Sequence, residues 1–175
     1  MFRRFGLVLM VTHDCNLRCS YCYVRAPREA GAAGSPRRMP QHLARKAIDR
    51  AIASLEPGGT LELGFFGGEP LLEAPLILAM ADYARCRAVS RGLGLSLNLT
   101  TNGTVTDPAA WAVMTLAEMD LAVSHDGLPE VHSQHRRRPD GCATSCRVLR
   151  TIHHLLDQDR PNPRGSTGST PSASC

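Results

Sequence analysis

Residues 12–23 read Thr-His-Asp-Cys-Asn-Leu-Arg-Cys-Ser-Tyr-Cys-Tyr and follow an apolar run at residues 6–11. One short loop therefore carries Cys15, Cys19 and Cys22 with the spacing Cys-x3-Cys-x2-Cys, and no fourth cysteine lies nearby in the sequence. Three thiolates can hold three irons of a cubane cluster and leave the fourth iron open. A structural cluster or zinc site is normally closed by a fourth ligand, so an open position indicates a catalytic metal centre.

Two motifs carry a family resemblance. The stretch at residues 15–23 resembles the cluster-binding loop of radical S-adenosylmethionine (SAM) enzymes. The run Gly67-Gly68-Glu69-Pro70 is similar to that family's second motif, which lies along the methionine end of SAM. The wording of the first loop most resembles the peptide- and protein-modifying branch, the SPASM or sulfatase-maturase type. The resemblance covers roughly residues 5–155.

The resemblance implies a function and its cofactors. Cys15, Cys19 and Cys22 would bind the iron of a [4Fe-4S] cluster, and SAM would chelate the open iron. Reductive cleavage of SAM would give a 5′-deoxyadenosyl radical that abstracts hydrogen, from a peptide or protein substrate in this branch. An electron donor such as flavodoxin or ferredoxin would be a partner. Because cluster and SAM carry the chemistry, no side chain is expected to be catalytic by itself.

The resemblance also implies which residues bind SAM. Glycine lets the backbone approach a ligand closely, which suits the Gly-Gly pair. The residue between the second and third cysteines would lie against adenine, and polar groups after the last strand would bind ribose hydroxyls. On strand alternation His125 points away from its two neighbours, which makes it a core or supporting residue and not a ligand. The expected SAM-binding residues are Tyr21, Gly67, Gly68, Glu69, Pro70, Asn102, Ser124 and Asp126.

Hydrophobic periodicity predicts alternating strands and helices. The predicted strands are 6–12, 60–66, 93–99 and 119–124. The predicted helices are about 40–55, stopped by Pro57-Gly58-Gly59, then about 74–90, one from an Asp107 N-cap to about 117, and one capped by Thr144 or Ser145. Such alternation predicts an α/β fold with a parallel sheet. Four polar or glycine-rich motifs each follow a predicted strand: the cysteine loop, Gly67-Gly68-Glu69-Pro70, Thr101-Asn102-Gly103 and Ser124-His125-Asp126-Gly127. They therefore share one rim of the sheet, where parallel barrels place their active sites.

The fold that we expect is a partial TIM-like (β/α)6 radical SAM barrel with about four β/α units. We expect residues 1–158 to form this incomplete core domain. In the last fifteen residues, eleven are Pro, Gly, Ser or Thr, so residues 159–175 are expected to be a disordered or frame-shifted tail. Strand 119–124 is then expected to be an open sheet edge, and the later SAM-binding groups and any auxiliary cluster to be absent.

Composition narrows the remaining classes. The 175 residues are 43% hydrophobic with a net charge of +4, and no apolar run is long enough for a signal peptide or a membrane span. We therefore expect a cytoplasmic protein, with no membrane and no nucleic acid as partners, and a solvated loop at Arg136–Arg138. Seven cysteines without a secretion signal indicate metal or redox use. Cys86 is expected to be buried in a helix.

Two alternatives remain open from the sequence. The chain could be a non-catalytic iron–sulfur-binding fragment of such an enzyme. It could instead be a zinc protein that adds a distant ligand such as His13 to the three cysteines. Cys142 and Cys146 could ligate a second cluster, but two ligands are too few to indicate one.

Overall fold

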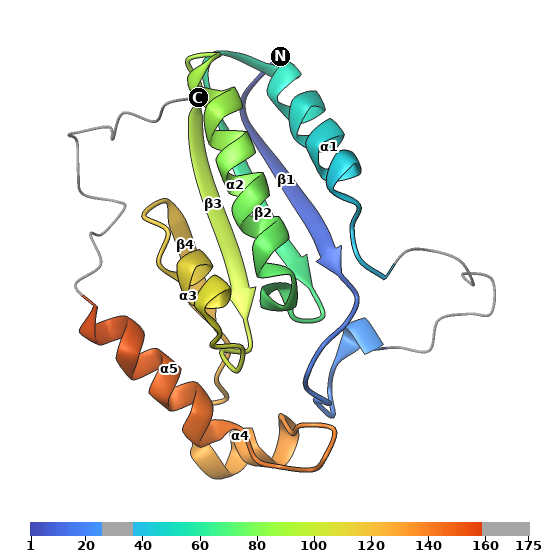
Figure 1. The fold of residues 1–175 in the computed structure, drawn as a ribbon, viewed down its shortest axis with the longest axis vertical. Helices are drawn as coiled ribbons and strands as arrows, with labels where there is room; N and C mark the ends of the chain where they lie inside the picture. Colours follow the sequence, from blue (N-terminus) through green and yellow to red (C-terminus); the bar gives the residue numbers. More distant parts are fainter. Residues whose placement is uncertain (26–36, 159–175) are drawn as a thin grey trace, which may run out of the picture.

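The computed structural model describes residues 1–25 and 37–158. One parallel sheet forms its centre (Figure 1), with the strand order β1-β2-β3-β4. The strands are β1 (Phe2–Thr12), β2 (Leu55–Gly67), β3 (Gly94–Thr101) and β4 (Met119–Val123). The predicted α/β class and the four parallel strands are confirmed.

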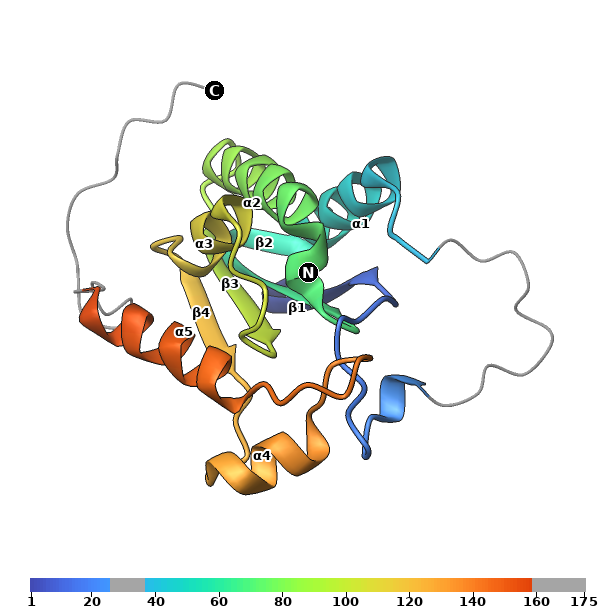
Figure 2. The ribbon, with the colours of Figure 1, turned by 60° about the horizontal axis from the view of Figure 1, so that its bottom comes forward.

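Helices cover one face of this sheet. They are α1 (Gln41–Ala53), α2 (Ala74–Val89) and α3 (Pro108–Met114), and Figure 2 shows the three side by side over the strands. The core between the layers is built from Leu, Ile, Val, Phe, Met and Ala side chains such as Leu63, Phe65, Ile48 and Met80. On the other face Val8 is 66% exposed. The sheet therefore has one packed and one open face within the described residues.

The end of the first helix was predicted wrongly. α1 ends at Ala53, and β2 begins at Leu55 and continues through Pro57-Gly58-Gly59. Phe2 of β1 pairs with Leu55, whereas Arg4 pairs with Thr60, so the register shifts across this segment. Gly58 has a φ of 75°, which glycine adopts without a Cβ penalty. The turn residues are thus absorbed as an irregularity inside the strand.

The C-terminal helices differ from the prediction in detail. The helix α4 (Pro129–His135) was not predicted, because its seven residues have no apolar periodicity; it is fixed by the buried side chain of His132. The helix α5 (Ser145–Asp157) has Thr144 as its N-cap, as expected, but without a side-chain capping bond. Asp107 does cap α3, accepting from the N–H groups of Ala109 and Ala110.

The remaining elements are short. The 3-10 turns η1 (Tyr23–Arg25) and η2 (Pro70–Glu73) follow the cysteine loop and β2. α3 ends three residues earlier than the predicted 117, and β3 extends two residues beyond the predicted 99. The predicted tail at 159–175 lies outside the described residues. No helix in the described ranges is long and apolar enough to cross a bilayer.

Candidate functional site

A pocket at the carboxyl ends of the strands brings most of the predicted site residues together. We call it the cysteine pocket. Its lining combines the three thiols with the ends of β2, β3 and β4, and consists of Cys15, Cys19, Tyr21, Cys22, Tyr23, Val24, Phe66, Gly67, Gly68, Glu69, Thr100, Thr101, Asn102, Ser124 and Arg136. Of the predicted site residues, only Pro70 and Asp126 are not in this lining. Pro70 is buried beneath it at the start of η2.

Gly67 and Gly68 are required for a contact with the cysteine loop. A Cβ on Gly67 would lie 2.3 Å from the carbonyl oxygen of Thr12, and one on Gly68 would lie 2.4 Å from that of Asp14. The N–H of Gly68 donates to the Thr12 carbonyl at 3.0 Å, and the N–H of Glu69 donates to the Asp14 carbonyl at 2.9 Å. The glycines therefore let the two loops pack backbone to backbone. The close approach predicted for a ligand is thus made, in this structure, by the backbone of the cysteine loop.

The side chain of Glu69 joins the ends of β2 and β3. It is 1% exposed, and its carboxylate accepts from the N–H of Leu71 at 3.1 Å, the hydroxyl of Thr101 at 2.7 Å and the N–H of Asn102 at 2.8 Å. Burial raises the pKa of Glu69, and the three hydrogen bonds lower it only in part. These partners satisfy the carboxylate from within the protein, so its role here is to fix the loops.

An amide network ties the first cysteine to the end of β3. The Nδ2 of Asn102 donates to the Oδ1 of Asn16 at 2.9 Å and lies 3.9 Å from the Sγ of Cys15. The Nδ2 of Asn16 donates to the Oγ1 of Thr104 at 2.9 Å, and the Oδ1 of Asn102 accepts from the N–H and hydroxyl of Thr104. Leu17 N–H also donates to the Cys15 sulfur, at 3.4 Å. The position of Cys15 is thus set by groups from its own loop and from the loop after β3.

The other end of the cysteine loop is held by the segment that follows β4. The hydroxyl of Tyr21 donates to the carboxylate of Asp126 at 2.7 Å, and Arg136 pairs with the same carboxylate at 2.9 Å. The guanidinium of Arg136 also lies 5.4 Å from the ring centre of Tyr21. Burial raises the pKa of Asp126, but the hydrogen bonds from Tyr21 and Arg136 outweigh it, and the net shift is downward.

Backbone pairing reinforces this attachment. Arg18 N–H donates to the carbonyl of Arg137 at 2.7 Å, and Ser20 N–H donates to the carbonyl of His135 at 3.0 Å. Arg136 stands between these two residues and is mostly buried, so the predicted solvated loop at Arg136–Arg138 is wrong for this arginine. No feature of the sequence separated it from the two arginines that follow.

A buried histidine supports the same segment. His132 is fully buried and stacks on His125, with ring centres 4.5 Å apart. Its Nδ1 accepts from the N–H of Asp126 at 3.4 Å, and its Nε2 lies 3.1 Å from the hydroxyl of Thr144. Burial, with the nearby His125 and Arg136, lowers the pKa of His132. His125 is outside the lining of the cysteine pocket.

Two of the three pocket thiols, those of Cys15 and Cys19, have a raised pKa. Burial raises the pKa of Cys15 and of Cys19, and in Cys19 the nearby Arg136 opposes this shift. Iron binding would therefore release protons from these thiols. In the described part of the chain no three His, Cys, Asp or Glu side chains are arranged to hold one metal ion.

A zinc site and an iron–sulfur cluster require different arrangements of the three thiolates. A zinc ion would need all its ligand atoms within roughly 2.0–2.3 Å of one point. A cubane cluster instead needs each thiolate to reach a different iron. Three thiols that line one pocket are the ligand set that a [4Fe-4S] cluster with one open iron would use.

The family model of the radical SAM superfamily matches residues 9–170. The chain belongs to the radical SAM superfamily. The match includes the cysteine loop, the Gly-Gly-Glu-Pro motif and the segments that follow β3 and β4 in this radical SAM domain.

Relatives within the superfamily include maturation enzymes. The chain is 30% identical over 143 residues to the serine-type anaerobic sulfatase-maturating enzyme of Klebsiella aerogenes, covering 81% of this chain and 34% of the relative. It is 27% identical over 154 residues to the sporulation killing factor maturation protein SkfB of Bacillus subtilis, covering 87% and 33%. A solved structure named native anSMEcpe with bound AdoMet and Kp18Cys peptide superposes with a TM-score of 0.72 at 23% identity, covering 89% and 41%.

The chain spans half or less of the length of these relatives. At 23% sequence identity, the solved structure shows only that the two chains share a fold, which is a part of the radical SAM barrel. Of the other cysteines within residues 1–25 and 37–158, Cys142 and Cys146 are exposed and Cys86 in α2 is half-buried, less than expected; none of these three lines the cysteine pocket.

Proposed function

We propose that this radical SAM domain binds a [4Fe-4S] cluster through Cys15, Cys19 and Cys22 and binds SAM beside it. The main observation in support is that the three thiols line one pocket together with the Gly-Gly-Glu-Pro loop and the ends of β3 and β4. When bound, the cluster would supply the electron for reductive cleavage of SAM, and the resulting 5′-deoxyadenosyl radical would abstract hydrogen from a substrate.

The residues of this chain would hold and shield the two groups. Backbone carbonyls of Gly67 and Gly68 would accept from the SAM ammonium, and Ser124 lies in the lining where a ribose hydroxyl could bind. Asp126 already accepts from Tyr21 and Arg136, so it would reach ribose only while sharing its carboxylate. The Tyr21 ring, which faces Arg136, would pack against adenine.

The proposed substrate is a peptide or protein side chain, with a small electron-transfer protein such as flavodoxin or ferredoxin as reductant. Support for the substrate comes from the maturation enzymes among the relatives and from the peptide named with the solved structure. A cytoplasmic location stays a prediction.

Anaerobic reconstitution tests the proposal. We expect a brown protein with about four irons and four sulfides per chain, and release of 5′-deoxyadenosine from SAM under dithionite. Substituting Cys15, Cys19 or Cys22 by Ala should abolish the charge-transfer absorption, whereas Cys142→Ala, at an exposed cysteine, should not. Full iron content in Cys19→Ala would reject the ligand assignment.

The second candidate, a non-catalytic cluster-binding fragment, gives a different result in the same experiment. It would take up the cluster and depend on the three cysteines, but release no 5′-deoxyadenosine. The short span of the chain relative to the maturation enzymes is the observation that favours it.

A further inference from the structure

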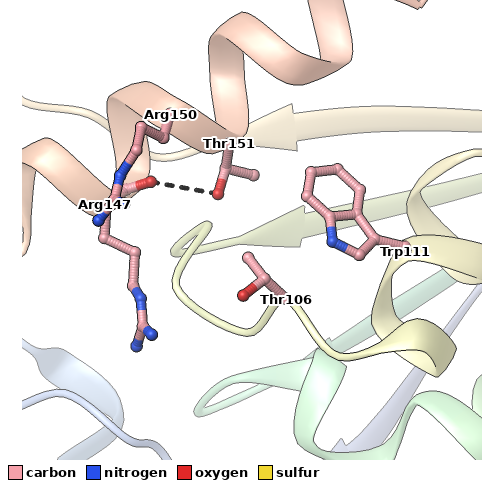
Figure 3. A pocket seen from close by; sticks show the side chains of 5 residues that line it. All are labelled: Thr106, Trp111, Arg147, Arg150 and Thr151. Atoms are coloured by element: carbon pink, nitrogen blue, oxygen red, sulfur yellow. Dashed lines mark hydrogen bonds between the residues drawn. The ribbon is translucent and has the colours of Figure 1, made fainter.

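A second hollow lies where α5 faces α3 and the loop between β3 and α3 (Figure 3). Its lining residues are Thr106, Trp111, Arg147, Arg150 and Thr151, and its volume is about 270 Å³. It shares no residue with the cysteine pocket. The volume is close to the lower end of small-molecule sites, about 300 Å³.

Two lining residues make contacts that hold the walls of this hollow together. The hydroxyl of Thr151, which is 2% exposed, donates to the carbonyl of Gly103 at 2.9 Å and fixes α5 to the loop after β3. The ring of Trp111 packs edge-on against His154, with centroids 4.6 Å apart, and joins α3 to α5. The two sides of the hollow therefore cannot separate without breaking these contacts.

The charge of the hollow is positive and uncompensated. Arg147 and Arg150 lie one turn apart on α5, both exposed. Within residues 1–25 and 37–158 neither forms an ion pair. Asp107, which follows the lining residue Thr106 in the sequence, accepts the N–H groups that cap α3 and is not part of the lining.

The polar groups around the hollow are mainly donors. Two guanidinium groups can each make paired hydrogen bonds to an oxyanion. The hydroxyl of Thr106 adds a further donor, and Figure 3 shows the indole nitrogen of Trp111 on the side of its ring that faces Thr106. A tetrahedral phosphate offers more acceptor oxygens to such a set than a carboxylate does.

We propose that this hollow binds a phosphate group, either as free phosphate or as the ester of a small molecule whose remainder packs beside Trp111. Arg147 and Arg150 supply the charge, and Thr106 supplies a hydroxyl. The site goes beyond the proposed radical chemistry and does not depend on it, because it uses neither the thiols nor the strand ends of the cysteine pocket.

The single tryptophan of the chain allows a direct test, since all its tryptophan fluorescence comes from Trp111. The full-length, cluster-loaded protein is titrated with inorganic phosphate and with adenosine monophosphate at constant ionic strength. Acetate serves as the oxyanion control, and equilibrium dialysis of labelled phosphate gives a readout independent of cluster absorption. We expect a saturable change with phosphate or its ester and none with acetate. Tighter binding of the nucleotide would identify an ester as the ligand, and equal binding would identify phosphate alone.

Variants make the assignment specific. Arg147→Gln and Arg150→Gln each remove a charge-assisted contact and should weaken binding about tenfold or more. Arg50→Gln removes the same charge from the exposed side of α1 and should change nothing. Wild-type affinity in the double Arg147→Gln/Arg150→Gln protein, an equal response to acetate, or no binding by either method would overturn the proposal.

Discussion

The carboxylate of Glu69, at the end of β2, accepts a hydrogen bond of 2.8 Å from the backbone N–H of Asn102, at the end of β3. The same carboxylate holds the hydroxyl of Thr101 and the N–H of Leu71. One buried side chain therefore fixes the second loop of the rim to the third. Asn102 in turn reaches the first cysteine through Asn16. The geometry of the thiols thus depends on residues that do not themselves offer sulfur.

Glu69→Gln should destabilise the protein by about 1–3 kcal/mol, because an amide group cannot accept all three donors and leaves a buried polar group unsatisfied. Urea denaturation of the metal-free protein measures this loss. Glu130→Gln, an exposed change of the same type on α4, should stay within about 0.5 kcal/mol of wild type. Equal stabilities of the two variants would contradict the bridging role of Glu69.

Gly68→Ala should cost about 1–3 kcal/mol, because its Cβ would overlap the carbonyl oxygen of Asp14 and push the two loops apart. The reconstituted variant should also hold less iron. Gly6→Ala in β1 is the matched control, since no atom lies within 4 Å of the added Cβ. Thermal melting and iron analysis of both proteins check this. A Gly68→Ala protein that matches Gly6→Ala in both measurements would refute the packing argument.

Asn102→Ala should lower stability by about 1–3 kcal/mol, since it leaves groups of Asn16 and Thr104 without their partner. In the reconstituted protein we also expect faster loss of iron to a chelator, because Cys15 loses its support. Asn98→Ala, on the exposed face of the same strand, should release iron at the wild-type rate. The rate is followed by the absorbance of the iron–chelator complex.

Stability should fall as the pH is lowered through the range in which His132 gains a proton. Its folded-state pKa lies below the ordinary value of 6.5, so the unfolded chain binds the proton first. The stability is therefore fully present above pH 6.5 and is lost as pH falls through the lowered pKa, with a slope of at most about 1.4 kcal/mol per pH unit. The charged groups that face this ring are His125, Asp126 and Arg136.

Denaturation curves at several pH values between 8 and 5 measure this slope. His132→Gln should remove most of it, whatever its effect at neutral pH. His153→Gln, at an exposed position of α5, should leave the slope unchanged. An unaltered slope in His132→Gln would show that another group controls the pH dependence.

The strands and the start of α3 were predicted correctly, because local sequence patterns determine them. Buried apolar runs predicted the four strands, and the Asp107-Pro108 pair predicted the start of α3. The Pro57-Gly58-Gly59 run was misread because a pairing with β1 places it inside a strand. The short helix α4 could not be predicted, because its anchors are tertiary: the burial of His132 and the pairing of His135 with Ser20.

The site was predictable to the same extent. Spacing and position after strands brought the three cysteines, the glycines and Asn102 to one pocket. Arg136 was not separable from its neighbours in the sequence, since its contacts are tertiary. It pairs with Asp126, 10 residues away, and lies over the ring of Tyr21 in the distant cysteine loop. The link of Asn16 to Thr104, 88 residues apart, had no sequence signal either.

The backbone pairing of residues 18–20 with residues 135–137 has a consequence for how the protein matures. Ser20 and its partner His135 are separated by 115 residues, a distance that a ribosome covers in roughly 6–23 s at about 5–20 residues per second. During that time the three cysteines have been synthesised, but the segment at residues 135–137 that pairs with their loop has not. Delivery of the proposed cluster would therefore follow synthesis of this segment, and a nascent chain stalled before it should expose three oxidisable thiols to its surroundings.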